Sequence, residues 1–204
     1  MQKVRFQISV SADGFMAGPN QSIDEPLGEG GEALHQWYFN LREGETSPSS
    51  RVIEETQAGY GAVVMGRNMF GGGRGAWPDE EWRGWWGENP PYHAPVFVVT
   101  HYEREPLTME GGTTFNFVTG GPDEALRLAR EAAGDLDISI AGGAQIARHF
   151  LTTGEVDEFW LSISPVMLGA GEPLLTGLDP NLRLEQIDSI AGPDAVHVKY
   201  RAKL

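Results

Sequence analysis

Three short apolar segments of the chain, 62–65, 96–99 and 138–141, run directly into residues whose groups are suited to binding phosphate. Glycine lets the backbone approach a ligand closely, and the guanidinium group of arginine presents a fixed fork of N–H donors. Hydroxyl, amide and imidazole groups add further hydrogen-bonding capacity. The residues concerned are Gly66, Arg67 and Asn68 after the first segment, Thr100 and His101 after the second, and Ala141, Gly142, Gly143 and Ala144 at the end of the third.

The pair Gly142-Gly143 matters because a helix is predicted to begin directly after it. Free backbone N–H groups and the positive end of the helix dipole make such a position an anion site. Each signal also has an ordinary explanation, since a Gly-Gly pair is commonly a tight turn and an arginine after a strand is commonly solvated. Their coincidence after three strands favours a phosphate-bearing cofactor.

Tryptophan is concentrated in one stretch of the chain, where four of the six tryptophans occupy positions 77, 82, 85 and 86. Three interpretations are open: a lid or pocket wall that stacks on a flat heterocycle, an oligomer contact, and an insertion packed on its own body. Trp37 lies apart from this stretch, at helical spacing from Leu34 and Leu41. It suits either a substrate pocket or the core.

The composition excludes several functions. The 204 residues carry 15 Lys and Arg against 29 Asp and Glu, and this net charge of −14 disfavours nucleic acid and anionic membranes as partners. With no cysteine, disulfides and cysteine nucleophiles are excluded, and the scattered histidines predict no metal site. No segment has the pattern of a signal peptide or a membrane span. We therefore expect a cytoplasmic protein with a small-molecule ligand.

The elements that would position these groups follow from hydrophobic periodicity. Residues 4–10 alternate apolar and polar side chains, which predicts a strand with one buried face. The three apolar segments do not alternate cleanly, which is typical of parallel strands buried on both faces. Helices are predicted at 33–41, 51–58, 122–132 and 144–151, and further strands at 115–119, 159–164, 182–190 and 196–204.

The order of these elements predicts a single α/β domain over residues 1–204. Its central sheet is mostly parallel and flanked by helices. The last two strands are joined by a turn at 191–194 and form a C-terminal antiparallel hairpin. Because ligands of open α/β sheets bind beyond the carboxyl ends of the strands, the three apolar segments direct their terminal residues to one site.

Six motifs, spread in order over nearly the whole chain, resemble those of a known family. They are Ser-Val-Ser-Ala-Asp-Gly-Phe-Met-Ala-Gly-Pro (9–19), Met-Gly-Arg-Asn-Met-Phe (65–70), Pro-Val-Phe-Val-Val-Thr-His (95–101), Ile-Ala-Gly-Gly-Ala (140–144), Asp-Glu-Phe (157–159) and Pro-Val-Met-Leu-Gly-Ala-Gly (165–171). The chain resembles the dihydrofolate reductase superfamily, in the branch similar to the C-terminal reductase domain of the bifunctional riboflavin-biosynthesis deaminase/reductase. The resemblance implies a dihydrofolate-reductase-like fold.

The resemblance also implies how NADPH would be held at its nicotinamide end. The loop 13–19 would close over the nicotinamide ring, as the corresponding loop does in dihydrofolate reductases. Ser9, Met16 and Ala17 would then lie near the ring.

The phosphate end of NADPH is implied in the same way. Arg67 would lie by the adenosine 2′-phosphate, and residues 142–146 would hold the pyrophosphate after a Gly142–Gly143 bond that is cis in the family. Thr100-His101 stands where the familiar dihydrofolate reductases carry Ser-Arg, a departure that bears on the preference for NADPH over NADH.

The predicted catalytic residues depart further from the family. Its reductases place a carboxylate on the first helix, where this sequence has Leu34 with Glu32 and His35 beside it, so folate reduction is not expected. His35 is favoured as proton donor because its unperturbed pKa lies near 6.5, with water as the alternative. Asp13, the family's loop acid, would fix the turn at Gly14 or, as the less favoured role, meet the substrate. Trp37 would line the substrate pocket opposite the nicotinamide.

We therefore predict an NADPH-dependent oxidoreductase that transfers hydride to a small heteroaromatic or carbonyl-type substrate. The resemblance implies a reaction similar to that of 5-amino-6-(5-phosphoribosylamino)uracil reductase or of dihydrofolate reductase. Two alternatives stay open: a non-catalytic nucleotide- or pterin-binding protein on the same fold, and a module whose tryptophans recognise a partner protein. The tryptophan-rich stretch and the terminal hairpin also predict a homodimer.

Overall fold

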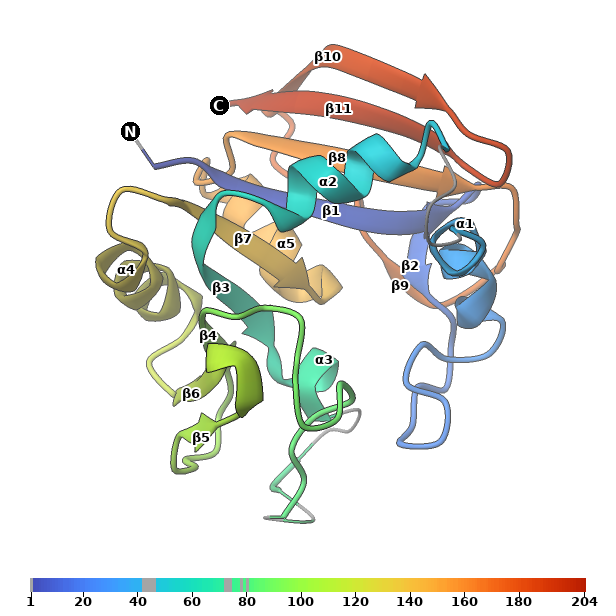
Figure 1. Cartoon of the computed structure of the whole chain (residues 1–204). Coiled ribbons are helices and arrows are strands. Elements are labelled where there is room, and N and C mark those ends of the chain that lie inside the picture. Colours follow the sequence, from blue (N-terminus) through green and yellow to red (C-terminus); the bar gives the residue numbers. More distant parts are fainter. Residues whose placement is uncertain (1, 42–46, 72–74, 78, 80) are drawn as a thin grey trace.

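A nine-stranded sheet runs through the computed structural model, which describes residues 2–41, 47–71, 75–77, 79 and 81–204 (Figure 1). The strands are β1 (Val4–Ser11), β3 (Tyr60–Gly66), β4 (Pro95–Val99), β5 (Leu107–Thr108), β6 (Thr114–Val118), β7 (Asp137–Gly142), β8 (Glu158–Ser164), β10 (Arg183–Ala191) and β11 (Val196–Lys203). Their order across the sheet is β10-β11-β8-β1-β7-β3-β4-β6-β5. A separate two-stranded sheet pairs β2 (Phe15–Ala17) with β9 (Glu172–Pro173).

The strands from β8 to β6 in this order are all parallel to one another. At one edge, β10 and β11 form an antiparallel hairpin that joins the sheet by antiparallel pairing of β11 with β8. At the other edge, β5 pairs antiparallel with β6. The predicted fold class, a mostly parallel sheet with a C-terminal antiparallel hairpin, is therefore confirmed.

Helices connect these strands and cover the sheet. They are α1 (Gln36–Phe39), α2 (Ser50–Gln57), α3 (Arg67–Gly71), α4 (Pro122–Ala133) and α5 (Ala144–Thr152), with 3-10 helices η1 (Gly31–His35) and η2 (Glu110–Gly112). Figure 1 shows α2 in front of the sheet and α5 behind it, so both faces of the central strands are covered. Within the described residues, no helix is long and apolar enough to cross a membrane.

Side chains of β3 show how the two faces of the sheet are filled. Ala62 and Val64 belong to a buried cluster that includes Leu151 of α5, whereas Val63 and Met65 belong to a separate cluster on the other face. Successive side chains of a strand point to opposite faces, so this division is what a strand covered on both sides requires. The prediction that this apolar segment is buried on both faces is confirmed.

β1 departs from the prediction of a single buried face. Its carboxyl half is buried on both faces, and Ser9 and Ser11 are only 3% and 1% exposed. The reason is that β1 lies between β7 and β8 while the indole of Trp37 covers its polar face, donating from Nε1 to Ser9 Oγ over 3.0 Å. Small hydroxyl side chains in this strand therefore mark a packed face.

The predicted helix at 33–41 is instead a 3-10 helix followed by one turn of α-helix. The buried side chains of this segment, Leu34 and Trp37, are three residues apart. Leu34 lies in the 3-10 helix and Trp37 in the α-helical turn that follows it, and both side chains point into the protein. Residues three apart lie on nearly the same side of either kind of helix.

A matched pair of substitutions tests the packing of α5 on the sheet. Leu151 is 0% exposed and Leu136 is 51% exposed. Leu151→Ala is expected to lower the free energy of unfolding by about 2–5 kcal/mol, because it leaves a cavity in the core. Leu136→Ala, on the surface, should change it by less than about 0.5 kcal/mol. Urea unfolding followed by circular dichroism measures both, and equal losses would contradict the burial described here.

Candidate functional site

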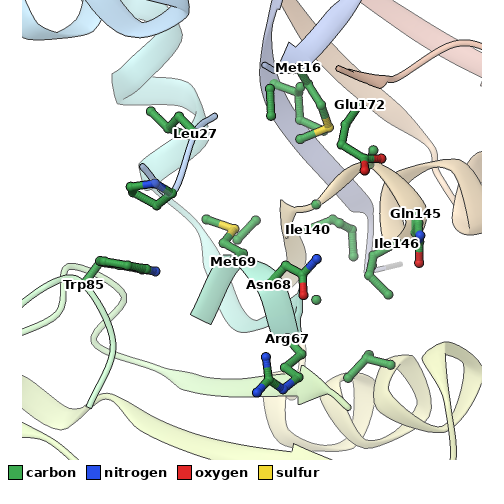
Figure 2. A pocket seen from close by; sticks show the side chains of 18 of the residues that line it. Met16, Leu27, Arg67, Asn68, Met69, Trp85, Ile140, Gln145, Ile146 and Glu172 are labelled. Atoms are coloured by element: carbon green, nitrogen blue, oxygen red, sulfur yellow. The ribbon is translucent and has the colours of Figure 1, made fainter. Parts of the chain in front are cut away.

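The carboxyl ends of β1, β7, β3 and β4 open into one cleft of about 1210 Å³. In the view of Figure 2, Trp85 and Leu27 lie on one side of it and Gln145 and Ile146 on the other, with Met69 and Asn68 between them. The cleft brings together all but two of the predicted site residues: Ser9, Met16, Ala17, His35, Trp37, Gly66, Arg67, Asn68, Thr100, His101, Ala141, Gly143, Ala144, Gln145 and Ile146. Asp13 and Gly142 are not among its lining residues.

The backbone is closely packed where β3 ends and α5 begins. A Cβ atom added at Gly66 would lie 3.2 Å from Ile146 Cγ1, so the glycine allows a close approach of the helix to the strand. The Gly142–Gly143 peptide bond is cis, as the resemblance implied. A Cβ atom at Gly143, by contrast, would meet nothing within 4 Å, and Gly143 lines the cleft. The N-terminus of α5 therefore faces space that a ligand can fill.

Arg67 lies in the first turn after β3 and is only 8% exposed. Its guanidinium group packs over the ring of Trp77 at 4.3 Å from the centroid and donates from Nη2 to the carbonyl of Ala76 over 3.1 Å. Burial lowers the pKa of Arg67, but a guanidinium group stays charged at neutral pH. The cleft therefore has a positive charge, held in one position, beside the end of β3.

Thr100 and His101 extend this part of the cleft from the end of β4. Thr100 is 3% exposed, and its Oγ1 accepts a hydrogen bond from the Tyr102 backbone N–H over 3.1 Å. That bond holds the turn after β4, while His101 is exposed and lines the cleft. The hydroxyl group of Thr100 thus serves the turn, and the imidazole faces the ligand space.

Asp13 lies outside the cleft and binds backbone instead. Its carboxylate accepts hydrogen bonds from the N–H groups of Leu168, over 3.1 Å, and Gly169, over 2.7 Å. A side-chain hydrogen bond with Ser11, together with these backbone bonds, lowers the pKa of Asp13. Of the two roles considered for Asp13, the structure shows a structural one: the carboxylate joins the turn after β1 to the segment after β8.

His35 is the member of the first-helix trio that reaches the cleft. Leu34, at the position of the family's carboxylate, is 0% exposed and belongs to the interior. Glu32 is exposed and does not line the cleft, whereas His35 is half-buried and does. Burial lowers the pKa of His35 below its usual 6.5, so the imidazole is mostly neutral at pH 7. A proton held by His35 is therefore readily released.

Sequence reasoning missed a buried polar cluster beneath the cleft floor. Trp37 satisfies both interpretations made of it, because it is 3% exposed and also lines the cleft. Below it lies His197 of β11, 0% exposed, whose ring nitrogens bond to Ser162 and Ser49. Burial lowers the pKa of His197 to about 4. His197 and Ser162 are partners in the pairing of β11 with β8. This pairing could have indicated the cluster, but it can be recognised only when the order of the strands in the sheet is known.

The tryptophan-rich stretch combines two of its three interpretations in the described residues. Trp82 Nε1 donates to the Phe70 carbonyl over 2.9 Å, and Trp77 Nε1 donates to the Tyr102 carbonyl over 3.2 Å. The stretch is therefore packed on the body of the protein. Trp85 and Trp86 also line the cleft, so it forms a pocket wall as well.

Comparison with known proteins shows the family to which the chain belongs. The model of the RibD C-terminal domain matches residues 2–198. The chain is 26% identical to the Bacillus subtilis protein YwjB over 98% of its own length and 97% of that protein. It is 42% identical to YyaP of the same organism over a shorter segment, which covers 26% of this chain and 28% of that protein.

Solved structures share the fold. A protein from Shewanella sp. PV-4 named for riboflavin biosynthesis matches with a TM-score of 0.62 and 21% identity over 100% of both chains. Dihydrofolate reductase from Enterococcus faecalis, complexed with NADP(H), matches with a TM-score of 0.56 and 12% identity over 99% of this chain and 97% of that one. A third match, with a TM-score of 0.57 and 14% identity, is a diaminohydroxyphosphoribosylaminopyrimidine deaminase/5-amino-6-(5-phosphoribosylamino)uracil reductase from Thermotoga maritima. The match covers 99% of this chain and 57% of that one. The dihydrofolate-reductase-like fold is confirmed.

The buried neutral state of His197 predicts a pH dependence of stability. Its pKa of about 4 lies below the value near 6.5 of an unfolded chain, so the unfolded state takes up the proton first as the pH falls. The contribution of His197 is complete above pH 6.5 and is lost as the pH falls towards 4, by about 3 kcal/mol. Urea unfolding at pH 7 and pH 4 should show this loss in the wild type and not in His197→Gln. The same loss in both proteins would contradict the assignment.

Proposed function

Because the chain belongs to the RibD C-terminal domain family, we propose that it is an NADPH-dependent reductase that transfers hydride to a small heteroaromatic or carbonyl-type substrate. The observation that carries the proposal is the convergence, in one cleft, of Arg67, the open backbone at Gly143 and the first turn of α5. Members of the family and its structural neighbours include reductases, which supports a reductase-type role.

The residues at the carboxyl edge fit the phosphate groups of NADPH. The pyrophosphate would lie against Gly143 and the backbone N–H groups that begin α5, where the helix dipole favours an anion. The absence of a side chain at Gly143 leaves room for it. Arg67 supplies the charge for a 2′-phosphate, with His101 beside it.

The nicotinamide end would lie towards β1. Met16 and Ala17 of β2 and Ser9 of β1 line that part of the cleft. When bound, NADPH supplies the hydride, and the protein binds and orients the reactants. Pairing of β2 with β9 holds the loop that carries Met16 and Ala17, so this wall of the site is built from both ends of the chain.

The substrate would lie between the aromatic walls of the cleft. Trp37, Trp85 and Tyr92 present apolar ring surfaces there, which suit a flat heterocycle. Hydride transfer to a C=N or C=O bond leaves negative charge on the heteroatom, so a proton must follow. His35 is the residue on the first helix that could deliver it, because its imidazole lines the cleft and its lowered pKa favours release.

Two measurements test the proposal. NADPH and NADH are titrated against the tryptophan fluorescence of the protein, and reducible pterins, pyrimidines and carbonyl compounds are then screened for loss of the absorbance of reduced nicotinamide. The proposal expects tight binding of NADPH, weaker binding of NADH and turnover with one of these classes. Failure of NADPH to bind would refute it, whereas binding without turnover in any class would favour the non-catalytic nucleotide-binding alternative.

A bulky side chain at Gly143 is expected to block the cofactor. Gly143 has ordinary backbone angles, with φ −71°, so valine fits the chain, but its side chain projects into the space proposed for the pyrophosphate. Gly143→Val should weaken NADPH binding at least about a hundredfold, because steric exclusion is added to lost anion contacts. Ala132→Val, on the exposed surface of α4, is the control for folding. Circular dichroism checks both variants, and unchanged affinity in folded Gly143→Val would rule out this placement.

Proton delivery by His35 predicts a distinct pH profile. Because burial holds the pKa of His35 below 6.5, the charged donor becomes more abundant as the pH falls from 8 to 6. Turnover should rise over that interval in the wild type. In His35→Gln it should be at least about tenfold lower and independent of pH there, with the affinity for NADPH unchanged. Steady-state kinetics with the substrate found in the screen measures both, and identical profiles would assign the proton to water.

A further inference from the structure

A ring of polar contacts forms part of the floor of the cleft and continues beneath it. Trp37 Nε1 donates to Ser9 Oγ over 3.0 Å. Gln7 Nε2 lies 3.5 Å from the same oxygen and donates to Ser162 Oγ over 3.0 Å. Ser162 Oγ lies 2.8 Å from His197 Nδ1, and the His197 and Trp37 rings meet edge-on at 4.7 Å between centroids. Gln7, Ser9 and Trp37 line the cleft, whereas Ser162 and His197 are 0% exposed.

The direction of one hydrogen bond in this ring is determined by chemistry, and that of the Gln7 bonds follows from the placement of the amide nitrogen. An indole nitrogen can only donate, so Ser9 Oγ is the acceptor of Trp37. The amide nitrogen of Gln7 also faces Ser9 Oγ and Ser162 Oγ. The oxygen of Ser9 is therefore used as an acceptor, which leaves its hydroxyl hydrogen as a donor.

The imidazole of His197 is held from its other side as well. Its Nε2 lies 3.0 Å from Ser49 Oγ, at the residue before α2. The hairpin turn packs against this pair, because a Cβ atom added at Gly192 would lie 2.4 Å from Ser49 Oγ and 3.4 Å from His197 Nε2. His197 thus lies between the end of the hairpin and the start of α2, with both ring nitrogens in hydrogen-bond contact.

The tautomer of His197 and the orientation of Gln7 are linked through Ser162. Ser162 has one hydrogen to donate. When the ring hydrogen of His197 is on Nε2, Ser162 donates to Nδ1 and accepts from Gln7 Nε2, which agrees with the contacts described. With the hydrogen on Nδ1, Ser162 Oγ would accept from both His197 and Gln7, and its own buried hydrogen would lose its acceptor. Reversing the Gln7 amide, which turns its oxygen towards Ser162, would restore that acceptor.

We propose that His197 is a positioning residue for the cleft floor: through Ser162 it holds the amide of Gln7 with the Oε1 atom available to a ligand, beside the hydroxyl donor of Ser9. In the described part of the chain, no residue donates a hydrogen bond to Gln7 Oε1. The floor then presents one acceptor and one donor, side by side. The positioning role of His197 rests on the proposed function only in assigning the cleft to a reductase.

This pair of groups matches the edge of an amide. A ligand with an N–H group next to a carbonyl oxygen would donate to Gln7 Oε1 and accept from Ser9 Oγ. Two ligands of the proposed reaction carry such an edge: the carboxamide of the nicotinamide and a cyclic amide of a heteroaromatic substrate. A site built to bond an N–H group strongly rejects an analogue in which that group is missing.

Two pairs of probes distinguish these sources. The first pair is NADPH and its reduced 3-acetylpyridine analogue, which lacks the amide N–H. The second is lumazine and 1,3-dimethyllumazine, measured by fluorescence with and without saturating NADP+. Wild-type protein should prefer the N–H member of one pair by at least about tenfold. A preference within the first pair would identify the nicotinamide carboxamide as the group bound by Gln7 and Ser9. A preference within the second pair would identify a cyclic amide of the substrate. No preference in either pair would overturn the proposal.

Substitutions then test the role of His197 in that preference. Ser162→Ala cuts the link between His197 and Gln7, and the preference should fall to less than about threefold. Ser164→Ala is the matched control, because Ser164 is 1% exposed on the same strand and donates only to the Leu34 carbonyl, over 2.7 Å. The control should keep the full preference. His197→Asn retains an acceptor for Ser162 and should keep most of it, whereas His197→Phe should lose it.

The outcomes separate a positioning role from a purely structural one. Thermal unfolding and circular dichroism establish that each variant is folded, and a structural role alone would lower stability without changing the ratio of affinities. Should His197→Phe not fold, Ser162→Ala and His197→Asn decide between the two. An unchanged ratio in Ser162→Ala would overturn the proposal. Failure of NADPH to bind the wild type would refute the proposed function, while the lumazine pair without cofactor would still test the floor.

Discussion

The contact between the end of β3 and the start of α5 determines where the functional groups of the cleft can lie. Gly66 has no side chain, so Ile146 packs directly against the strand. This contact sets the N-terminus of α5 beside Arg67, which follows Gly66 in the chain. A side chain at Gly66 would lie 3.2 Å from Ile146 Cγ1, so the helix or the strand would have to shift slightly. The phosphate site proposed above depends on this contact between the strand and the helix.

Much of this arrangement could be predicted from the sequence. The apolar segments at 62–65, 96–99 and 138–141 are recognisable as buried parallel strands because their side chains do not alternate, and their terminal residues meet because parallel strands end at one edge. The terminal hairpin was predictable because its two strands are joined by a short turn, which makes them antiparallel neighbours. Local sequence patterns were sufficient wherever the position of an element in the sequence also determines which elements lie next to it in the structure.

The rest depends on contacts between distant segments. The polar floor joins Gln7, Ser162 and His197, which come from three strands, and it exists only once β11 lies beside β8 and β8 beside β1. No spacing in the sequence indicates that order. The change from α-helix to 3-10 helix near Leu34 has a similar cause, because it depends on which side chains the interior accepts. Tertiary packing decides both features, and periodicity reports neither.

The carboxylate of Asp13 gives the wall of the cleft a mechanical property. It binds the backbone of residues 168 and 169, the Ala12 N–H donates to the Val166 carbonyl over 2.8 Å, and β2 pairs with β9. The loop after β1 and the segment after β8 are thereby clamped into one body, although more than 150 residues separate them in sequence. An insertion or deletion in either segment would therefore break contacts made by the other. We expect changes of length on this side of the cleft to be tolerated only when both segments change together.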